Sequence, residues 1–332
     1  MDEFAIPLSR PLWTDDEQRA YAASSATDVA AFEAELAAAC GRRWAVTLWP
    51  GWQAVRLALV AVGVGPGETV RVPALLRHGF AAAVADTGAV SEIVDVNPAT
   101  WCMRLPPRLA GRRRSLVVNE LGFPARSWAG DVCIAPAAPP LPATTQASCT
   151  CLDFDYYMGG PLEVECAAIV GDDDGLGDTV RDLAAAAARG GPPFVYTSDA
   201  AGAAMLRVRL ARLGALHDER RRIAARYLLR LAGSRIQLQA DFSTRTWSRL
   251  AVLLPPGAAP AEVVARLAAA GIEAGAAVHP HDQLAEPAVA DQFPVAADIA
   301  RRSLALPLWS GLGDAEVDRV AEALLAAIDA PR

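Results

Sequence analysis

The sequence predicts an α/β protein with a large layered domain and a smaller C-terminal αβ domain. Two observations indicate this fold class. Over the first 200 residues, short apolar runs of strand length alternate with helical patterns, which is typical of a mainly parallel sheet covered by helices. After them, a long helical pattern begins and shorter αβ segments follow. With 332 residues, 53% of them hydrophobic, the chain has enough apolar material for both cores.

Changes in pattern along the chain divide it into three parts. Residues 1–25 are expected to form an extended N-terminal arm. Residues 26–200 form the large domain, predicted to have three layers. Residues 201–332 comprise a long connecting helix and the small C-terminal domain.

The elements of the large domain follow from periodicity. Apolar residues at helical spacing predict helices at 28–40, 52–62 and 78–86. Thr27 or Asp28 can cap the first of these helices. Short β-rich runs predict strands at 44–48, 69–72, 90–94, 116–119, 132–135, 149–154 and 167–170.

The C-terminal part carries longer helical patterns. Apolar residues recur at helical spacing from Met205 to Leu231, which predicts one long helix. A strand is expected at 248–254, and further helices are expected at 261–270, 295–303 and 314–328.

Charge and composition exclude several partners and locations. The net charge of −7 argues against a nucleic-acid or anionic membrane partner. No uncharged apolar stretch reaches the ~18 residues of a membrane span, and acids stand where a signal peptide carries bases. The six cysteines fall in predicted core segments and are expected to be reduced. These features predict a cytoplasmic protein.

The chain contains no lysine, because all 31 basic residues are arginine. A Schiff base needs a primary amine on a flexible stem, and a guanidinium group cannot supply it at neutral pH. Chemistry that depends on a lysine–aldehyde linkage is therefore excluded.

Four blocks of the sequence carry a resemblance to a known family. Residues 46–98 and 293–324 are the most specific, and residues 119–125 and 164–171 lie between them. In this order they resemble the DegT/StrS-type sugar aminotransferases. The resemblance implies a fold-type-I aminotransferase-like architecture, which belongs to pyridoxal-phosphate enzymes. It also implies a site at a two-fold interface, and therefore a homodimer or a heterodimer with an active homologue.

The positions that hold the cofactor in that family are changed here. The resemblance places Met158 or Gly159 at the lysine, and neither is the histidine of the family's pyridoxamine-phosphate dehydratases. The phosphate-binding serine corresponds to Asp153, whose carboxylate would repel a phosphate dianion. Arg77 replaces the aromatic residue that stacks on the ring, and Trp52 fills the phosphate-binding turn. Further replacements fall at Pro136, Pro139, Val195 and Thr197. We therefore expect no cofactor, and we also expect no metal.

The replacement residues define the candidate site. Side chains that move protons give the expected catalytic residues, which are Asp153, Asp155, His78, Tyr156 and Glu120. Side chains with stacking surface or a guanidinium group give the expected substrate-binding residues, which are Trp49, Trp52, Arg77, Phe123 and Tyr157. Asp153 and Asp155 alternate on a strand and can share one face as a coupled carboxylate pair. Because they add negative charge, the expected substrate is a neutral or cationic small molecule with aromatic or apolar surface.

Each of these interpretations has a plainer structural alternative. His78 suits an exposed helix start, and bulky side chains fill an emptied cleft because voids are costly. Cys149, Cys151 and Cys166 lack a zinc-ligand spacing and suit a packed core. The segment 279–282, with two histidines and an aspartate, suits an exposed loop as well as a metal or acid–base cluster.

Two functions remain open from the sequence. The first is an enzyme that works without pyridoxal phosphate and acts on a specialised-metabolite intermediate by acid–base chemistry. Isomerisation, cyclisation, elimination and condensation all fit this description. The alternative is a catalytically inactive pseudo-aminotransferase that dimerises with a pathway enzyme and stabilises it.

The resemblance predicts a dimer in solution. Light scattering at micromolar concentration should give about twice the chain mass of 34.9 kDa. A monomer at that concentration would contradict this prediction and would weaken the idea of a site completed by a second chain.

Overall fold

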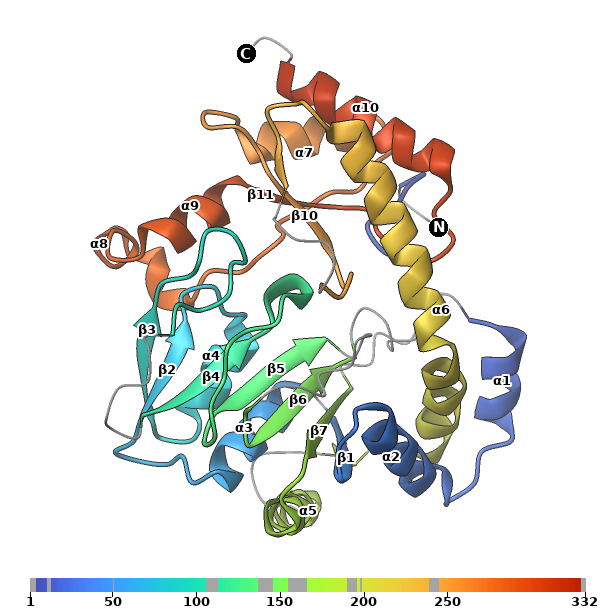
Figure 1. Cartoon of the computed structure of the whole chain (residues 1–332), viewed down its shortest axis with the longest axis vertical. Coiled ribbons are helices and arrows are strands. Elements are labelled where there is room, and N and C mark those ends of the chain that lie inside the picture. The colour runs from blue at the N-terminus through green and yellow to red at the C-terminus, as the bar shows by residue number, and fades with distance from the viewer. Residues whose placement is uncertain are drawn as a thin grey trace.

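The large domain is built around a mixed sheet, and the computed structural model shows how its strands are ordered. The structure describes residues 4–10, 13–49, 51–105, 113–136, 146–154, 166–189, 196–197, 199–238 and 245–329. Eight strands of this sheet lie in the described ranges (Figure 1). They are β1 (Trp44–Trp49), β2 (Thr69–Pro73), β3 (Val90–Val94), β4 (Arg114–Val118), β5 (Val132–Pro136), β6 (Cys149–Asp153), β7 (Ala167–Gly171) and β8 (Tyr196–Thr197).

The strand order brings the C-terminal ends of several parallel strands to the same edge of the sheet. The order is β3-β2-β4-β5-β6-β7-β1-β8. The strands from β3 to β6 pair in parallel, whereas β7 runs antiparallel to both β6 and β1. The predicted mainly parallel sheet is therefore confirmed. In the register of β5 and β6, Asp153 lies opposite Pro136, so both residues end their strands at the same edge.

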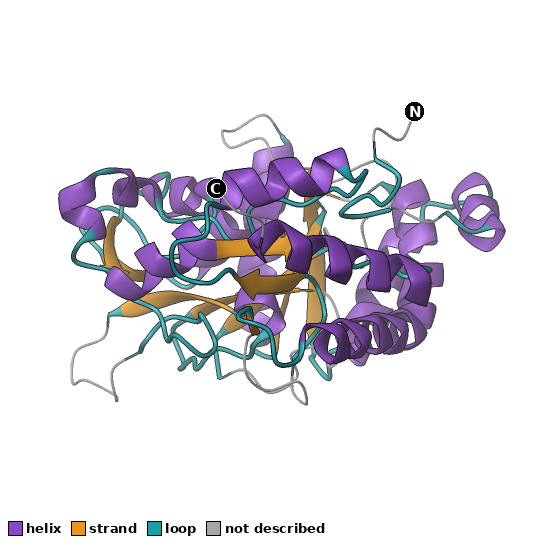
Figure 2. Cartoon of the chain, turned by 90° about the horizontal axis from the view of Figure 1, so that it is seen from above, coloured by secondary structure: helices purple, strands orange, loops and turns teal. Residues whose placement is uncertain are grey.

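Helices cover both faces of the sheet, which completes three layers (Figure 2). One face is covered by α3 (Gly51–Ala61), α4 (His78–Ala85) and α5 (Asp174–Ala188). The opposite face is covered by α2 (Asp28–Ala39) and the first half of α6 (Ala200–Leu231).

Helix α5 differs from the sequence prediction, which placed no helix over these residues. Its N-cap is Asp173, whose side chain accepts a hydrogen bond from the Leu176 backbone N–H at 3.1 Å. An aspartate before an alanine-rich run is a helix-start signal that the sequence does contain.

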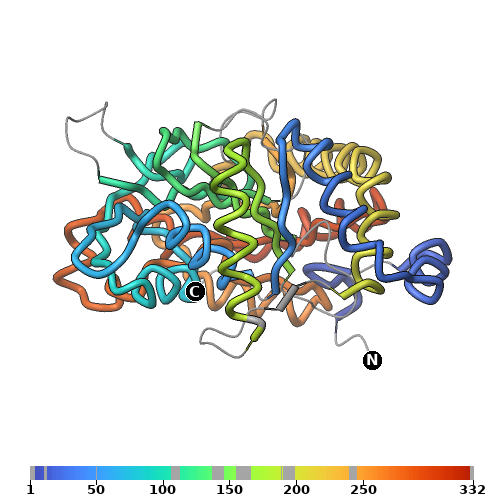
Figure 3. The backbone as a smooth tube through the Cα atoms, turned by 90° about the horizontal axis from the view of Figure 1, so that it is seen from below, coloured from blue at the N-terminus to red at the C-terminus, as the bar shows by residue number. Residues whose placement is uncertain are grey.

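The N-terminal region differs from the extended arm that the sequence predicts. It contains α1 (Asp15–Ala22), which packs against α6 at the edge of the molecule (Figure 3). Thr14 and Glu17 form a reciprocal capping box, and the Glu17 carboxylate also binds the buried Arg209 guanidinium through two hydrogen bonds of 2.9 Å. The Thr-x-x-Glu spacing is the signal for this helix start.

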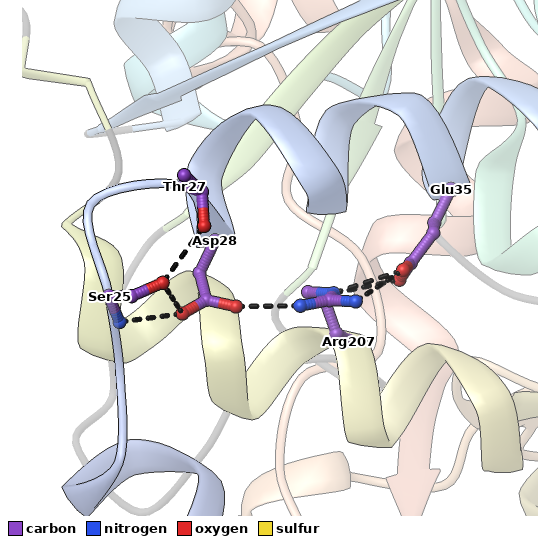
Figure 4. Close-up of polar contacts among 5 residues, drawn as sticks. All are labelled: Ser25, Thr27, Asp28, Glu35 and Arg207. Atoms are coloured by element: carbon purple, nitrogen blue, oxygen red, sulfur yellow. Dashed lines mark hydrogen bonds and ion pairs between the residues drawn. The ribbon is translucent and has the colours of Figure 1, made fainter.

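A cluster of ion pairs fastens α2 to α6 (Figure 4). The Arg207 guanidinium donates to Asp28 at 2.6 Å and to Glu35 at 2.7 Å. Asp28 in turn accepts from the backbone N–H and the hydroxyl of Ser25. One arginine on α6 therefore binds α2 at two positions, Asp28 at its start and Glu35 further along the helix.

The small domain packs around the second half of α6. Its strands are β9 (Gln237–Leu238), β10 (Leu250–Leu253) and β11 (Ser303–Leu306). Within the described residues they have the order β11-β10-β9, and neighbouring strands are antiparallel. Ile223, Tyr227 and Leu231 of α6 are buried in its core. Its helices are α7 (Pro260–Ala269), η2 (Asp282–Ala285), α8 (Pro287–Ala290), α9 (Pro294–Arg302) and α10 (Asp314–Asp329).

A separate apolar cluster joins the two domains. Leu75 and Trp101 of the large domain pack in it with Leu253 and Val278 of the small domain. Beside it, the Asp95 carboxylate accepts hydrogen bonds from the first backbone N–H groups of α9 at 3.2 and 2.9 Å. The boundary thus combines apolar burial with a helix cap. No helix in the described ranges is long and apolar enough to cross a membrane.

The buried pair between Arg209 and Glu17 should contribute strongly to stability. Their side chains are 4% and 1% exposed, so Arg209→Met would leave a buried carboxylate without its main partner. We expect a loss of about 3–5 kcal/mol in the free energy of unfolding, measured by urea denaturation. Arg301→Met is the control, because Arg301 is 71% exposed and its ion pair spans 4.0 Å. The control should change stability by less than about 1 kcal/mol. Equal losses in the two variants would contradict the prediction.

Candidate functional site

Two adjoining cavities lie at the edge of the sheet where β2, β4, β5 and β6 end. The first, here called the polar cavity, measures about 640 Å³ including its open mouth. Its polar lining comprises Arg77, Asn119, Glu120, Asp153, Ser248, Arg249 and His279. Residues of both domains contribute to it. Crevices outside the carboxyl ends of parallel strands are the usual ligand sites of open α/β sheets.

The second cavity, here called the apolar cavity, has a volume of about 530 Å³, which also includes its open mouth. It lies at the N-terminus of α3, and Trp52 and Val55 of that helix line it with Cys151 and Ala167 of the sheet. Arg77 and Asp153 line both cavities. The two spaces therefore meet at this pair of side chains.

Arg77 and Asp153 form an ion pair at that junction. Arg77 is the N-cap of α4, and its guanidinium Nη1 lies 3.0 Å from Asp153 Oδ2 at the end of β6. The guanidinium group also lies 5.4 Å from the centroid of the Phe80 ring. Asp153 is 21% exposed, so the pair is partly shielded from water. The charge of Asp153 is therefore largely compensated by Arg77.

Glu120 presents a different kind of carboxyl to the polar cavity. It follows β4 in the short helix η1 (Glu120–Gly122) and is half-buried. Among the residues that the structure describes, no hydrogen bond to its carboxyl occurs. Burial raises its pKa to about 7, while the positive charges of Arg249, Arg77 and Arg245 partly oppose that effect. A carboxyl of this kind exchanges protons near neutral pH, as a general acid or base does.

His279 and Arg249 bring the small domain into the polar cavity. Burial lowers the pKa of His279, and the charges of Arg249 and Arg77 lower it further. The Arg249 guanidinium donates to the Ala277 carbonyl at 3.1 Å. The sequence analysis noted His279 only as part of a His-rich loop, and it did not identify Arg249. No local pattern marks Arg249, since its role depends on how the two domains meet.

Three of the expected site residues lie away from both cavities. The His78 side chain is 82% exposed, and its Nδ1 lies 2.7 Å from Asp282 Oδ2. Phe123 is 2% exposed and packs beneath the Arg245 guanidinium. Trp49 ends β1 with 39% of its surface exposed. None of the three is among the described residues that line either cavity.

The remaining expected residues divide into two groups. Glu120, Asp153, Trp52 and Arg77 line the cavities, as described above. Asp155, Tyr156 and Tyr157 lie outside the described residues, as do Met158 and Gly159.

The cysteines show no arrangement for metal binding. All six lie in the described ranges, are buried and form no disulfide bond there. Cys149 and Cys151 pack on the α3 side of the sheet, whereas Cys166 packs on the α2 side. Burial raises the pKa of the Cys149 thiol to about 12, so it stays protonated. In the ranges that the structure covers, no group of three or more His, Cys, Asp or Glu side chains could hold a metal ion.

The described lining does not fit pyridoxal phosphate held as an aldimine. No residue of the chain carries an amine side chain, and guanidinium groups cannot form the linkage. At the N-terminus of α3, where the resemblance places the phosphate, the cavity wall carries the Trp52 indole. Asp153 lines the same space, so a carboxylate stands where the resemblance places a phosphate-binding serine.

Comparison with known proteins places this geometry in context. The dTDP-3-amino-3,4,6-trideoxy-alpha-D-glucose transaminase of Streptomyces venezuelae is 32% identical over 232 residues, which cover 61% of this chain and 60% of that protein. The chain thus spans about three fifths of the length of that curated relative.

Solved structures share the fold over nearly the whole chain. DesV of S. venezuelae, in complex with a ketimine intermediate, matches with a TM-score of 0.77 and 24% identity, covering 95% of each chain. The GDP-4-keto-6-deoxy-D-mannose-3-dehydratase of E. coli, with bound hydrated PLP, matches with a TM-score of 0.81 and 18% identity, covering 97% of this chain and 99% of that one.

The family comparison agrees with these matches. The model of the DegT/DnrJ/EryC1/StrS aminotransferase family matches residues 18–107 and 194–325. These ranges include Arg77 and the small-domain wall of the polar cavity, with Ser248, Arg249 and His279, whereas Glu120 and Asp153 lie between the two matched ranges. The chain therefore belongs to the DegT/DnrJ/EryC1/StrS aminotransferase family.

Proposed function

We propose that this chain is a pyridoxal-phosphate-independent enzyme that transfers a proton on a carbonyl-bearing small molecule, with Glu120 as the general base. The observation that carries this proposal is the Glu120 carboxyl itself. It is half-buried, it faces a cavity, and burial raises its pKa to about 7. A base is most effective when its pKa lies near the working pH.

The arginines around Glu120 can stabilise the negative charge that forms when the substrate loses a proton. When the Glu120 carboxylate takes a proton from a carbon beside a carbonyl, the electron pair of the C–H bond moves to the carbonyl oxygen. Arg249 and Arg77 line the same cavity and can stabilise that oxyanion. Return of the proton to another carbon gives an isomer, and loss of a β-substituent gives an elimination product. His279 can carry a proton at the same cavity, since burial keeps it neutral.

Asp153 serves in this proposal as the anchor of Arg77. The sequence analysis favoured Asp153 and Asp155 as bases, but the 3.0 Å ion pair commits the Asp153 carboxylate to Arg77. Glu120 has no comparable partner among the described residues. The apolar cavity beside the ion pair, with Trp52 in its wall, offers a surface for an apolar part of the substrate.

The charges around the polar cavity favour a neutral or anionic substrate. The guanidinium groups of Arg77 and Arg249 line it. Of its two carboxyl groups, Asp153 is paired with Arg77, and Glu120 is about half-protonated near pH 7. A cationic ligand, which the sequence analysis allowed, would meet repulsion there. Because the names of related proteins denote nucleotide-linked sugars, one of them a keto sugar, we propose this class as the first to test.

The alternative function is an inactive partner that stabilises a pathway enzyme. The ion pair between Arg77 and Asp153 favours this alternative, because the two charged groups satisfy each other inside the cleft without a ligand. A homodimer is compatible with both functions.

The purified protein should be colourless and remain so with added pyridoxal phosphate. The reason is the absence of any lysine, together with the indole and carboxylate at the cavity. Absorption spectroscopy and calorimetry measure this binding. An aldimine band that saturates at one cofactor per chain, or micromolar binding of pyridoxamine phosphate, would contradict the prediction.

Glu120→Gln should abolish proton transfer without unfolding the chain. The test incubates the full chain with nucleotide-linked keto sugars in D₂O and follows, by NMR, the loss of the proton signal beside the carbonyl. We expect exchange with the wild type and a rate lower by about 10²- to 10⁴-fold in Glu120→Gln.

The matched control is Glu322→Gln, at a carboxyl that is 67% exposed on α10. It should exchange at the wild-type rate, and circular dichroism should show that both variants are folded. Undiminished exchange in Glu120→Gln would reject Glu120 as the base. Absence of exchange with every keto sugar would favour the inactive partner.

The rate should also depend on pH in a defined direction. Because the base must be deprotonated, kcat/KM should rise with pH and level off above the Glu120 pKa of about 7. A profile that stays flat from pH 5 to 9 would contradict this role.

A further inference from the structure

The loop that carries Glu120 has an unusual backbone shape. Immediately after Glu120, Leu121 has φ +50° and ψ +25°, and Gly122 has φ +87°. The left-handed region disfavours a branched side chain such as that of Leu121. Such a conformation persists where the surrounding structure imposes it. Contacts from outside the loop therefore hold it in this shape.

These contacts come from the small domain, in the segment 245–249 that leads into β10. The Arg245 Nε donates to the Leu121 carbonyl at 3.0 Å, and the Thr246 backbone N–H donates to the Gly122 carbonyl at 3.1 Å. The fit is close, because a Cβ atom at Gly122 would lie 2.0 Å from the Thr246 carbonyl oxygen. Both the positive φ and the lack of space therefore require glycine at position 122.

Arg245 is itself held on several sides. It is 2% exposed, and its guanidinium lies 5.0 Å from the Phe123 ring centroid and 4.5 Å from the Trp247 ring centroid. Its Nη2 donates to the Arg249 carbonyl at 2.7 Å. Only a planar, forked cation can stack between two rings and direct separate N–H groups at two carbonyls.

The same residue acts on Glu120 through its charge. Burial raises the pKa of the Glu120 carboxyl, and the Arg245 charge is one of three that oppose this effect. Phe123, which the sequence analysis expected to bind substrate, is instead part of the packing around Arg245.

We propose that Arg245 is a positioning residue that fastens the Glu120 loop to the small domain, so that the base faces the polar cavity only while the two domains are joined. This inference rests on the proposed role of Glu120. Arg245 is buried and does not line either cavity. In this inference it nevertheless controls the geometry and the charge of the reacting Glu120 carboxyl.

The test observes Glu120 directly and needs no substrate. The full chain is labelled with glutamate that carries ¹³C at the side-chain carboxyl, and Glu120→Gln identifies the Glu120 signal. Its titration is then compared in wild type, Arg245→Lys and Arg245→Met. Removing the charge in Arg245→Met should move the titration midpoint upward, because the Arg245 charge opposes the effect of burial on the Glu120 pKa. Arg245→Lys keeps the charge, so its midpoint should stay near that of the wild type.

The exchange rate separates geometry from charge. Both variants should lose about 10-fold or more in deuterium exchange, because lysine cannot make both directed hydrogen bonds. Arg266→Met is the control, since Arg266 donates to the Ala327 carbonyl in another part of the small domain. It should leave the Glu120 midpoint and the exchange rate unchanged. If Arg245→Met does not fold, Arg245→Gln removes the charge and keeps an amide donor.

The outcomes distinguish this inference from the proposed function. A midpoint that is the same in wild type and the folded uncharged variant, with only a lower melting temperature, would overturn the positioning role of Arg245. That result can occur while Glu120→Gln still abolishes exchange, which would leave the proposed function intact. A raised midpoint supports the inference even where no keto sugar exchanges.

Discussion

The boundary between the two domains is the constraint on which the candidate site depends. The polar cavity has one wall from the ends of β4, β5 and β6 and another from Ser248, Arg249 and His279 of the small domain. An apolar cluster and the Asp95 cap of α9 hold these walls together. If the domains separated, Glu120 would lose the burial that raises its pKa and two of the three arginines that oppose that effect, Arg245 and Arg249. The site therefore exists only in the assembled chain.

The absence of lysine shapes both the structure and the proposed chemistry. Arginine pairs carboxylates with two directed hydrogen bonds, and the chain uses this geometry where α6 meets α1 and α2, through Arg209 and Arg207. Arginine also keeps its charge at every physiological pH. The cations of the polar cavity consequently cannot exchange protons, and this role falls to Glu120 and His279.

Much of the fold could be predicted from the sequence, because strand and helix periodicities are local. The strands from β1 to β7 lie close to the predicted runs, and α6 covers the predicted long helix. The local analysis missed α5 and the helix in the N-terminal region, although Asp173 and the Thr14–Glu17 spacing signal both. The antiparallel direction of β7 has no such signal, since it depends on how distant strands pair.

The sequence by itself determined that no lysine can hold an aldehyde cofactor, and the family resemblance located the replaced positions. The sequence could not show which carboxyl group among those positions is suited to proton transfer. The tertiary structure did so, because the pKa of a carboxyl depends on burial and on charges that are distant in sequence. Asp153 meets Arg77, whereas Glu120 is desolvated beside Arg245 and Arg249, more than a hundred residues away along the chain. The pairing of Asp153 arises within the large domain, whereas the environment that suits Glu120 to proton transfer arises only when the two domains pack together.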